Sequence, residues 1–364
     1  MRRKGGRRIH KNNMKVFVVK KPFEFGLTEA PIPVCGYDGV VVKIHAAAIC
    51  HSDFDIMEGR RKHQIHFPNI IGHEFTGVVA EKGAGVKHVS VGDSVVCECI
   101  IWCGTCRHCR MGLTSLCENF SELGTMEPGA FAEYTAVPGR LVHRADGITT
   151  EEAALIEPAG NGFHAAEKAG ILPGDNVVVI GPGPIGNLAM QCAALYHPGE
   201  LIVVGTRDSR LALAKKLGAS HTINITNQNA AESIMEITKN RGADRIINCA
   251  TTDSSFELAM KVANKNSTIV MEGLSGSGKP LQILMDDFII KTVSVVPATG
   301  VHTKQFLNVM ALVREKKINP GALVTHKYPL VKIDEALRKY RENRDEVMKI
   351  LLYPDNKTPD NQGH

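Results

Sequence analysis

Residues with metal-ligating side chains occur at three separate places in the first half of this sequence. Cys50 stands apart, His73 and Glu74 are adjacent, and Glu157 is followed by a proline. A thiolate, an imidazole and a carboxylate form a ligand set that suits Zn²⁺, with a coordination position left for water or a substrate. The simpler alternative is that a cysteine and a histidine so far apart are unrelated core residues. Two further motifs favour the zinc site.

The first of these motifs is a group of closely spaced cysteines. Cys103, Cys106 and Cys109 form two C-x₂-C steps, and Cys117 follows after seven more residues. Four sulfurs close a tetrahedral zinc site and leave no position for a substrate, which is typical of structural zinc. The alternatives are four independent buried cysteines, or a redox pair that leaves two thiols unexplained.

The second motif is a glycine-rich turn between the apolar run 176–180 and the helical pattern that starts at Asn187. Strand, G-x-G-x-x-G and helix in this order are the fingerprint of a dinucleotide-binding unit. The glycines allow a tight turn, close approach of the pyrophosphate and close packing of the helix, whose N-terminus faces the phosphates. The residues expected to contact the cofactor here are Gly181, Gly183, Pro184, Ile185 and Gly186.

The residue that would choose between NAD(H) and NADP(H) lies at the end of the next apolar run. An acid normally stands there, about 20 residues beyond the glycines, and bonds the ribose hydroxyls. Here the position is Gly205, followed by Thr206 and Arg207, with Arg210 three residues further on. The guanidinium groups could hold a 2′-phosphate with charge-assisted hydrogen bonds, so the sequence predicts NADP(H) over NAD(H). The alternative is that Asp208 takes over the ribose.

Two patterns of elements position these residues. Residues 14–45 alternate short β-rich runs with proline and glycine, and strand-like runs return at 76–80 and 92–96. This pattern predicts a small, irregular β-barrel that carries the metal-ligating residues. After about residue 160, apolar strands alternate with helical patterns, which predicts a parallel, doubly wound sheet. The expected fold class is therefore α/β.

Length and composition are those of a two-domain globular enzyme. The chain has 364 residues, of which 43% are hydrophobic and 22% are charged. No apolar run reaches the ~18 residues that a membrane span requires. The net charge is +5, but residues 1–13 hold six of the basic residues and no acid. Because the rest is close to neutral, neither nucleic acid nor a membrane is an expected partner.

The basic residues 1–13 lack the apolar stretch and the cleavage site of a secretory signal. Met14, directly after them, is a candidate for the natural start, and a short targeting or anchoring arm is the alternative. The ten cysteines of the chain are expected to be free thiols in a reducing cytoplasm. Cys97 and Cys99 are assigned no role.

Taken in order, these motifs resemble the zinc-containing medium-chain dehydrogenase/reductases, in the polyol dehydrogenase branch that includes sorbitol and threonine dehydrogenases. The resemblance covers nearly the whole chain. It implies a GroES-like β-barrel catalytic domain over residues 14–158 and 301–364, and a Rossmann domain over residues 159–300. The substrate would bind in the cleft between them, and the basic extension 1–13 stands outside both.

The resemblance also implies roles for single residues. Cys50, His73 and Glu74 would be ligands of a catalytic zinc, with Glu157 bound directly or through water. A second zinc would occupy the four-cysteine lobe, which makes two zinc ions per chain. Ser52 would pass on the hydroxyl proton of the substrate.

Two neighbours of these residues are given supporting roles by the resemblance. Asp53 would orient the zinc-bound histidine, and His51 would contact the cofactor. The sequence departs from the family pattern at Gly205, where NAD-dependent relatives have an acid, and at two further positions. Asp55 stands where many relatives carry a histidine that relays the proton. The arginine expected near Val301 in sorbitol-type enzymes is missing, which argues against sorbitol itself.

The expected activity is hydride transfer between NAD(P) and a secondary alcohol, in a polyol or a related small polar molecule, with a ketone as the product. The family habit implies a homotetramer or homodimer. One alternative is a threonine-type or simple-alcohol dehydrogenase. Another is a non-enzymatic dinucleotide-binding protein on the same fold, which would have no need of the metal-ligating residues. A nucleic-acid-binding zinc module would require binding through the basic extension.

Overall fold

The computed structural model describes residues 13–61, 65–250, 252–274 and 280–355. They form two compact units, one from the chain up to Glu157 together with the chain from Val324 onward, and the other from Pro158 to Leu323. Residues 1–12 of the basic extension lie outside the described residues. No helix in the described part of the chain combines the length and the apolar character that crossing a bilayer requires.

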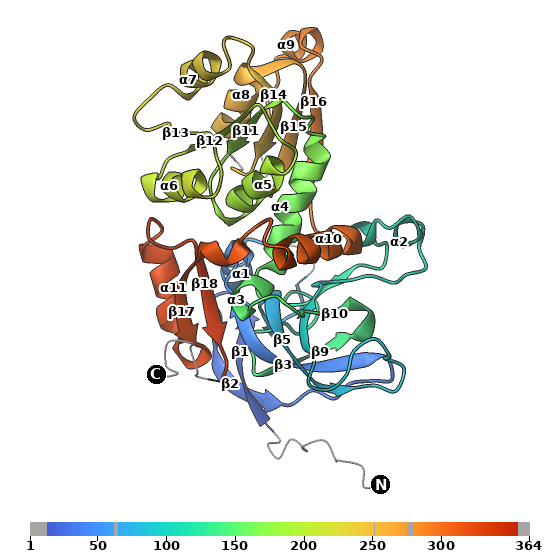
Figure 1. The fold of residues 1–364 in the computed structure, drawn as a ribbon. Helices are drawn as coiled ribbons and strands as arrows, with labels where there is room; N and C mark the ends of the chain where they lie inside the picture. The colour runs from blue at the N-terminus through green and yellow to red at the C-terminus, as the bar shows by residue number, and fades with distance from the viewer. Residues whose placement is uncertain (1–12, 62–64, 251, 275–279, 356–364) are drawn as a thin grey trace. The chain divides into compact units, whose positions relative to one another are not determined.

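The first unit is built around a seven-stranded sheet, whose central strand β3 pairs antiparallel with β5, β9 and β18 (Figure 1). In spatial order the strands are β10 (Val142–Arg144), β6 (Ser94–Cys97), β5 (Glu74–Lys82), β3 (Gly39–Ala48), β18 (Lys349–Tyr353) and β17 (Val324–Pro329), with β9 (Tyr134–Pro138) beside β3. Valine, isoleucine and alanine make up most of β3, and most of its residues are buried.

Smaller elements complete the first unit. Its other strands form a three-stranded sheet of β2 (Glu24–Pro31), β1 (Asn13–Lys21) and β4 (Asn69–Ile70), and a pair of β7 (Ile100–Ile101) and β8 (Ser121–Glu122). Its α-helices are α1 (His51–Met57), α2 (Arg107–Arg110), α3 (Thr150–Ala153) and α11 (Ile333–Glu342). Large buried side chains such as Phe17, Ile44 and Phe75 form one core under the sheets. The strand-rich, irregular architecture expected of this half is confirmed.

The second unit is a six-stranded parallel sheet with helical connections. Its spatial order is β13 (His221–Asn224), β12 (Glu200–Gly205), β11 (Asn176–Ile180), β14 (Ala243–Asn248), β15 (Ala263–Glu272) and β16 (Ser294–Ala298). Its helices are α5 (Pro184–Ala194), α6 (Asp208–Lys216), α7 (Ala230–Ile237), α8 (Asp253–Val262), α9 (Met285–Ile290) and α10 (Thr303–Arg314). Numbered within the unit, the strand order is 3-2-1-4-5-6, the order of a dinucleotide-binding sheet. The doubly wound α/β class is therefore confirmed.

The domain boundary differs from the sequence-based assignment in one segment. Residues 301–323 were expected in the catalytic domain, but they belong to the second unit. The reason is the apolar face of α10, where Phe306 and Val309 are buried. Polar contacts of α10 point the same way, since Gln305 Nε2 donates to Glu167 Oε2 of α4 (Ile156–Ala169) at 2.6 Å.

Candidate metal centres and cofactor site

The strand register of the first unit brings the separate metal-ligating residues together. β5 begins at Glu74, directly opposite Ala48 at the end of β3, and Cys50 follows two residues later as the N-cap of α1. The ligand atoms of Cys50, His73 and Glu74 all lie within 4.8 Å of one another. Three residues named from the sequence therefore converge, and their types are those that bind zinc.

Two glycines let β5 take this position. Gly72 has a φ of +93°, and a Cβ added there would lie 2.3 Å from the ring of Phe131. A Cβ at Gly77 would lie 2.2 Å from the backbone oxygen of Lys43 on β3. A side chain at either position would push β5 away from its neighbours. Both glycines are therefore needed to hold the metal-ligating residues that lie between them.

Asp53 is fully buried beside His73. Its Oδ2 accepts a hydrogen bond from the backbone N–H of Cys50 at 2.8 Å, which caps α1. Its Oδ1 lies 3.8 Å from His73 Nδ1, and neither of these two buried atoms has a hydrogen-bond partner in the described chain. Burial raises the pKa of Asp53 to about 6. With Nδ1 facing a carboxylate, Nε2 of His73 is left for a metal, so the residues present fit zinc.

The charges around His73 also favour a cation. Burial alone would lower the pKa of its imidazole. The Cys50 sulfur, with Asp53 and Glu157, nevertheless holds that pKa well above the ordinary value. The groups that face this ring therefore favour a cation on it. A divalent metal on the same donors would take the place of the proton.

Glu157 lies beside this group without being one of its three converging ligands. It occupies the first turn of α4 and is buried, but its carboxylate is not within 4.8 Å of all three donors. Cys99 Sγ donates to Glu157 Oε1 at 3.7 Å. The sequence analysis assigned Cys99 no role, and the structure makes it a direct partner of Glu157.

Lys349 is a residue of this site that the sequence analysis missed. β18 pairs with β3 opposite Ala47 and Ala48, which brings Lys349 Nζ to 2.6 and 2.5 Å from the two carboxylate oxygens of Glu74. The two side chains are 4% and 1% exposed. Burial opposes the charge of the lysine, but the Glu74 carboxylate raises its pKa above the ordinary value. The signal in the sequence was a charged residue at the start of an apolar strand, because a buried lysine needs a partner.

Replacing Lys349 with methionine is expected to lower the free energy of unfolding of the zinc-free protein by about 3–5 kcal/mol, because a buried carboxylate loses its counter-charge. Zinc should recover part of this loss, since Glu74 then faces another cation. Urea unfolding with and without zinc measures both effects. The control is Lys332→Met, whose 3.5 Å pair with Glu335 is 55% and 48% exposed, and which should cost less than about 1 kcal/mol. Equal stability of Lys349→Met and the parent protein would contradict the buried pair.

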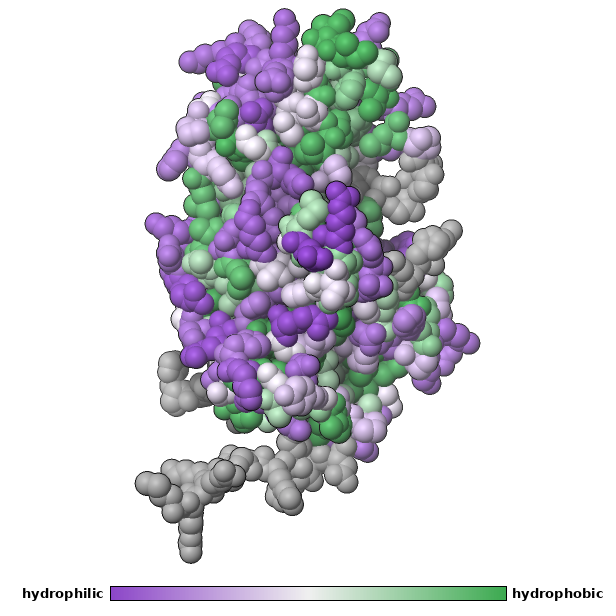
Figure 2. All heavy atoms as spheres, turned by 90° about the vertical axis from the view of Figure 1, so that its right-hand side faces the viewer, coloured by the Kyte–Doolittle hydropathy of each residue, from purple (hydrophilic) through white to green (hydrophobic). Residues whose placement is uncertain are grey.

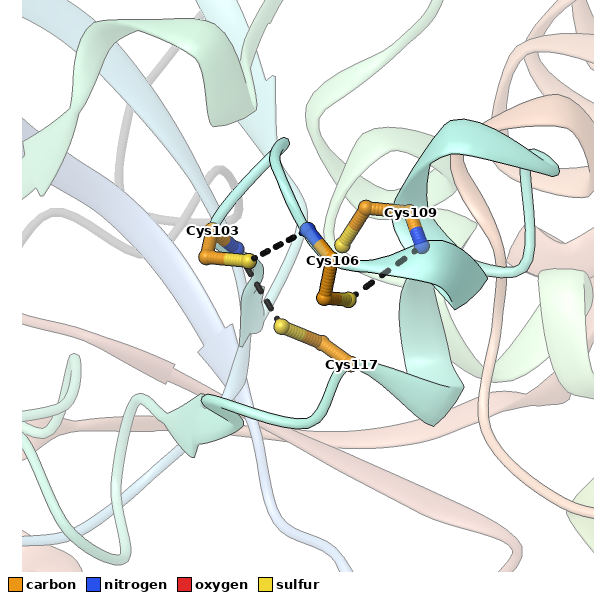
Figure 3. Close-up of side chains that lie close together, drawn as sticks. All are labelled: Cys103, Cys106, Cys109 and Cys117. Carbon is orange, nitrogen blue, oxygen red and sulfur yellow. Dashed lines mark hydrogen bonds between the residues drawn. The ribbon is translucent and has the colours of Figure 1, made fainter.

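The four cysteines predicted to close a structural zinc site also converge. The sulfurs of Cys103, Cys106, Cys109 and Cys117 lie within 4.8 Å of one another, and Figure 3 shows the four side chains directed toward a common point. Backbone N–H groups donate to three of these sulfurs. Cys103 donates to Cys117 at 3.2 Å, Cys106 to Cys103 at 3.4 Å, and Cys109 to Cys106 at 3.5 Å. The loop is folded so that its backbone stabilises negative charge on sulfur.

These contacts favour thiolates, the form that binds zinc. Hydrogen bonds from Thr105 and the backbone of Cys106 lower the pKa of Cys103 to about 5. The backbone N–H of Cys109 lowers the pKa of Cys106, whereas burial raises the pKa of Cys109 to about 12. Without metal, the Cys109 thiol is therefore the one that burial keeps protonated. With four sulfurs and no open position, the residues fit a closed zinc site.

In the second unit the glycine fingerprint joins β11 to α5. Gly181 turns the chain with a φ of +92°. A Cβ on Gly186 would lie 2.0 Å from the Gly181 oxygen, so only glycine lets the helix pack this closely. At Gly183 the nearest atom to an added Cβ is Arg210 Nη1 at 3.9 Å, which leaves the backbone open to a phosphate. Pro184 is the first residue of α5, where its missing N–H costs nothing.

A cavity of about 710 Å³ adjoins this loop, a volume typical of ligand sites. Its wall includes Arg207, Arg210 and Lys261, and its one acidic residue is Glu257. Lys261, on α8, is a third cation that the sequence analysis missed. Asp208, the alternative ribose partner, is not part of the wall. Its Oδ1 instead accepts a hydrogen bond at 2.6 Å from Nδ2 of Asn224, the last residue of β13.

Gly205 and Thr206 also line this cavity, and Gly205 has a packing partner of its own. A Cβ at Gly205 would lie 2.5 Å from the ring of Pro182, the residue between the first two glycines of the fingerprint. An acidic side chain at the end of β12 therefore cannot be accommodated while Pro182 occupies this space. Pro182 in the glycine loop and Gly205 at the end of β12 therefore go together, and both would have to change to admit the ribose-binding acid.

The remaining residues expected near the cofactor lie in different units. Ile185 is half-buried in the first turn of α5. His51 belongs to the first unit, in α1, with a side chain 56% exposed and its Nε2 3.9 Å from Asp55 Oδ1. Asp55, at the position of the relay histidine, also accepts a hydrogen bond from Arg60 Nε at 2.8 Å. The contact of His51 with a cofactor stays a prediction.

Comparison with known proteins agrees with both units. The family model of the alcohol dehydrogenase GroES-like domain matches residues 36–147, and that of the zinc-binding dehydrogenases matches residues 184–315. Sorbitol dehydrogenase of Bacillus subtilis (strain 168) is 30% identical over 347 residues, which cover 94% of this chain and 98% of that protein. L-threonine 3-dehydrogenase of Symbiobacterium thermophilum is 34% identical over 337 residues, 90% of this chain and 94% of that protein.

A solved structure shows the same fold over nearly the full length. It is described as a short chain alcohol dehydrogenase from E. coli CFT073 complexed with NADH, and it superposes with a TM-score of 0.88 at 28% sequence identity, covering 94% of this chain and 100% of that one. The two family models fall on the unit that carries the metal-ligating residues and on the unit that carries the glycine fingerprint. The chain therefore belongs to the zinc-dependent medium-chain dehydrogenase/reductases, oxidoreductases that act on alcohols with a nicotinamide cofactor, in the branch that includes the sorbitol and threonine dehydrogenases.

Proposed function

We propose that this enzyme oxidises a secondary alcohol in a polyol or amino alcohol, and reduces the matching ketone, at a zinc ion held by Cys50, His73 and Glu74. The observation that carries the proposal is the convergence of these donors close to Ser52, whose buried Oγ forms no hydrogen bond within the described chain. A buried hydroxyl without a partner is costly unless a ligand completes it. The relatives named for sorbitol and threonine act on molecules with a secondary hydroxyl beside other polar groups.

The residues of this chain have distinct tasks in that reaction. When bound, zinc supplies a Lewis acid that lowers the pKa of the substrate hydroxyl, and nicotinamide supplies the hydride acceptor. Asp53 keeps the ring of His73 in the orientation that leaves Nε2 free. Ser52 Oγ takes the hydroxyl proton as the alcohol is oxidised. Glu157 lies beside the donors, and its carboxylate could bind the metal directly or through water when it turns toward them.

A substrate screen tests the proposal directly. Polyols, amino alcohols and sugar acids are offered with NAD⁺ and with NADP⁺, and kcat/KM is measured for each pair. At least one polyol or amino alcohol should exceed ethanol clearly. Ser52→Ala should lower kcat by roughly 10²–10⁴-fold, the usual contribution of a positioned proton acceptor, with the zinc content unchanged. A protein that binds a dinucleotide tightly but oxidises none of these alcohols would instead support the non-enzymatic alternative.

We further propose that NADP(H) is the preferred cofactor. The end of β12 carries no carboxylate to repel a 2′-phosphate, and Pro182 excludes one. Three cations, Arg207, Arg210 and Lys261, line the adjoining cavity. Asp208, which could otherwise bind the ribose, is already hydrogen-bonded to Asn224. The charge of this cavity suits a phosphate better than bare ribose hydroxyls.

The parent enzyme is expected to favour NADP⁺ by tenfold or more in kcat/KM, about 1.4 kcal/mol. Arg207→Ala should reduce kcat/KM for NADP⁺ by roughly 10–100-fold, the cost of one charged hydrogen bond, and change the NAD⁺ value little. The matched control is Lys216→Ala, an exposed cation outside the cavity wall, at the last residue of the helix that Arg207 precedes. A parent enzyme that prefers NAD⁺ tenfold would contradict the proposal.

Reversing the preference requires two changes, because Gly205→Asp alone would collide with Pro182. Pro182→Ala with Gly205→Asp should move the ratio of kcat/KM values toward NAD⁺, and Pro182→Ala alone should not. The comparison separates the effect of the new carboxylate from the effect of a changed loop.

We also propose a homodimer or homotetramer. In the second unit, β16 is an edge strand, and large apolar side chains are exposed just before it. They are Leu281, Ile283, Leu284, Met285, Ile289 and Ile290. Figure 2 shows apolar surface gathered at the top of the view, where Figure 1 places α9. A second copy would cover both the apolar residues and the strand edge, and light scattering of the parent beside Ile290→Lys tests this.

We infer that the enzyme works in the cytoplasm. Cysteine binds zinc as a thiolate, and Cys50 and the four-cysteine lobe keep that form only where thiols stay reduced. Cell fractionation with an antibody to the chain tests the location, and recovery of the protein outside the cytoplasmic fraction would overturn it.

A further inference from the structure

Cys99 touches Glu157, although no step of the proposed reaction uses it. The two side chains are buried together, with Cys99 Sγ 3.7 Å from Glu157 Oε1. In this contact the thiol donates and the carboxylate oxygen accepts.

The backbone around Cys99 is held firmly on both sides. The residue lies between β6 and β7, and its carbonyl oxygen accepts a hydrogen bond from the backbone N–H of Leu123 at 2.9 Å. The preceding N–H, of Glu98, donates to Leu141 O at 2.9 Å. The Glu98 side chain is bound as well, since His143 Nε2 lies 2.8 Å from its Oε1. These hydrogen bonds fix the position of Cys99, so its sulfur can position a neighbouring side chain.

Glu157 is the partner whose side chain can change rotamer. Its backbone is set by the first turn of α4, but its carboxylate ends a chain of three rotatable bonds. In the structure the carboxylate is turned to Cys99 and lies outside the group formed by Cys50, His73 and Glu74. A change of the Glu157 rotamer would exchange the contact with Cys99 for a contact with a metal bound by those three donors.

We propose that Cys99 is a positioning residue that holds the Glu157 carboxylate away from the catalytic metal, and that breaking the S–H···O contact lets Glu157 become a ligand. A thiol is a weak donor, so this contact can be broken and remade at little cost. The open coordination position that a substrate needs is then kept available without a fixed fourth protein ligand. The inference rests on the proposed function only in placing a metal at Cys50, His73 and Glu74.

The test compares Cys99→Ala and Cys99→Ser with Cys97→Ala. Cys97 is a matched control because it is also buried and lies two residues away, at the end of β6. The first measurement is the rate at which a chelator removes the catalytic metal. The second is the visible absorption of the Co²⁺-substituted enzyme, which weakens when coordination rises from four to five ligands. The third is kcat and KM for the best substrate of the screen.

Cys99→Ala removes the restraint, so Glu157 should bind the metal, slow its removal by roughly tenfold, weaken the Co²⁺ absorption and lower kcat more than it changes KM. Cys99→Ser introduces a stronger donor, so metal removal should become faster than in the parent. Opposite shifts in these two variants are not expected from a packing role alone. Should one variant fail to fold, the other still decides the direction. Cys97→Ala should match the parent in all three measurements.

Glu157→Ala provides the background for the final comparison. Adding Cys99→Ala to this variant should leave the rate of metal removal unchanged, because the Glu157 carboxylate that Cys99 positions is then absent. A slowing that persists without Glu157, or equal behaviour of Cys99→Ala and Cys97→Ala, would overturn the proposal. Failure of the parent to oxidise any alcohol would overturn the proposed function instead, while the metal-removal rates would still decide the role of Cys99.

Discussion

Cys50→Ser is expected to lower kcat by roughly a thousandfold or more while the protein stays folded. The thiolate is one of three donors that converge on the candidate catalytic site, and a Lewis acid supplies several kcal/mol of transition-state stabilisation, each 1.4 kcal/mol being about tenfold in rate. A serine hydroxyl is a much poorer zinc ligand, so the metal should leave this site. Metal analysis should therefore fall from about two zinc ions per chain to about one.

The appropriate control for this variant is Cys35→Ser, a change of the same chemistry at a partly exposed thiol of the first unit. It should keep full zinc content and turnover. Circular dichroism and thermal unfolding of Cys50→Ser should stay close to those of the parent, because the structural lobe keeps its four sulfurs. Retention of both zinc ions and full activity in Cys50→Ser would show that the catalytic metal is held elsewhere.

Cys103→Ser is expected to have the largest effect on stability. It removes one sulfur from a closed four-sulfur site, in a loop with little other regular structure between β7 and β8. Metal binding at such a site contributes directly to the free energy of folding. A loss of several kcal/mol should lower Tm by on the order of 10 °C, since about 1 kcal/mol shifts Tm by 2–4 °C in a protein of comparable unit size. One zinc ion should be lost, and the ion at Cys50 should remain.

Thr105→Val is the control for the four-cysteine lobe. It removes the hydroxyl that donates to Cys103 Sγ at 3.4 Å but keeps all four ligands. Zinc content should be unchanged and Tm should fall by only a few degrees, as expected for one lost hydrogen bond of about 1 kcal/mol. Treating the parent with a strong chelator should reproduce the larger loss seen in Cys103→Ser. An unchanged Tm in the zinc-free parent would mean that the lobe is stable without metal.

The parts of the sites that the sequence predicted well are those held within short stretches of chain. Spacing alone brings Cys103, Cys106 and Cys109 within reach of one metal, because each C-x₂-C step spans about one turn of backbone. The glycine fingerprint is local in the same way, since strand, turn and helix follow one another without interruption. The α/β class likewise follows from the period of the apolar residues, which changes after about residue 160. The four cysteines converge as expected, and the fold class is confirmed.

Other contacts depend on residues that are distant in sequence and meet only through strand register and packing. Lys349 reaches Glu74 across 275 residues because β18 and β5 flank the same end of β3. Cys99 meets Glu157 across 58 residues. The apolar pattern of a strand does not tell which residue of a distant strand will lie opposite, because the packing of the whole core sets the register.

The sequence by itself therefore determined the donor types, the closed four-sulfur site, the dinucleotide fingerprint and the α/β class. Each of these depends on residue chemistry and on spacing within a turn or two of backbone. Only the tertiary structure decided that Lys349 balances the buried charge of Glu74, that Pro182 excludes an acid at Gly205, and that residues 301–323 belong to the second unit. These contacts depend on which apolar faces and buried charges meet in the folded chain. A buried charge without a partner costs free energy, so the packing of distant segments decides them.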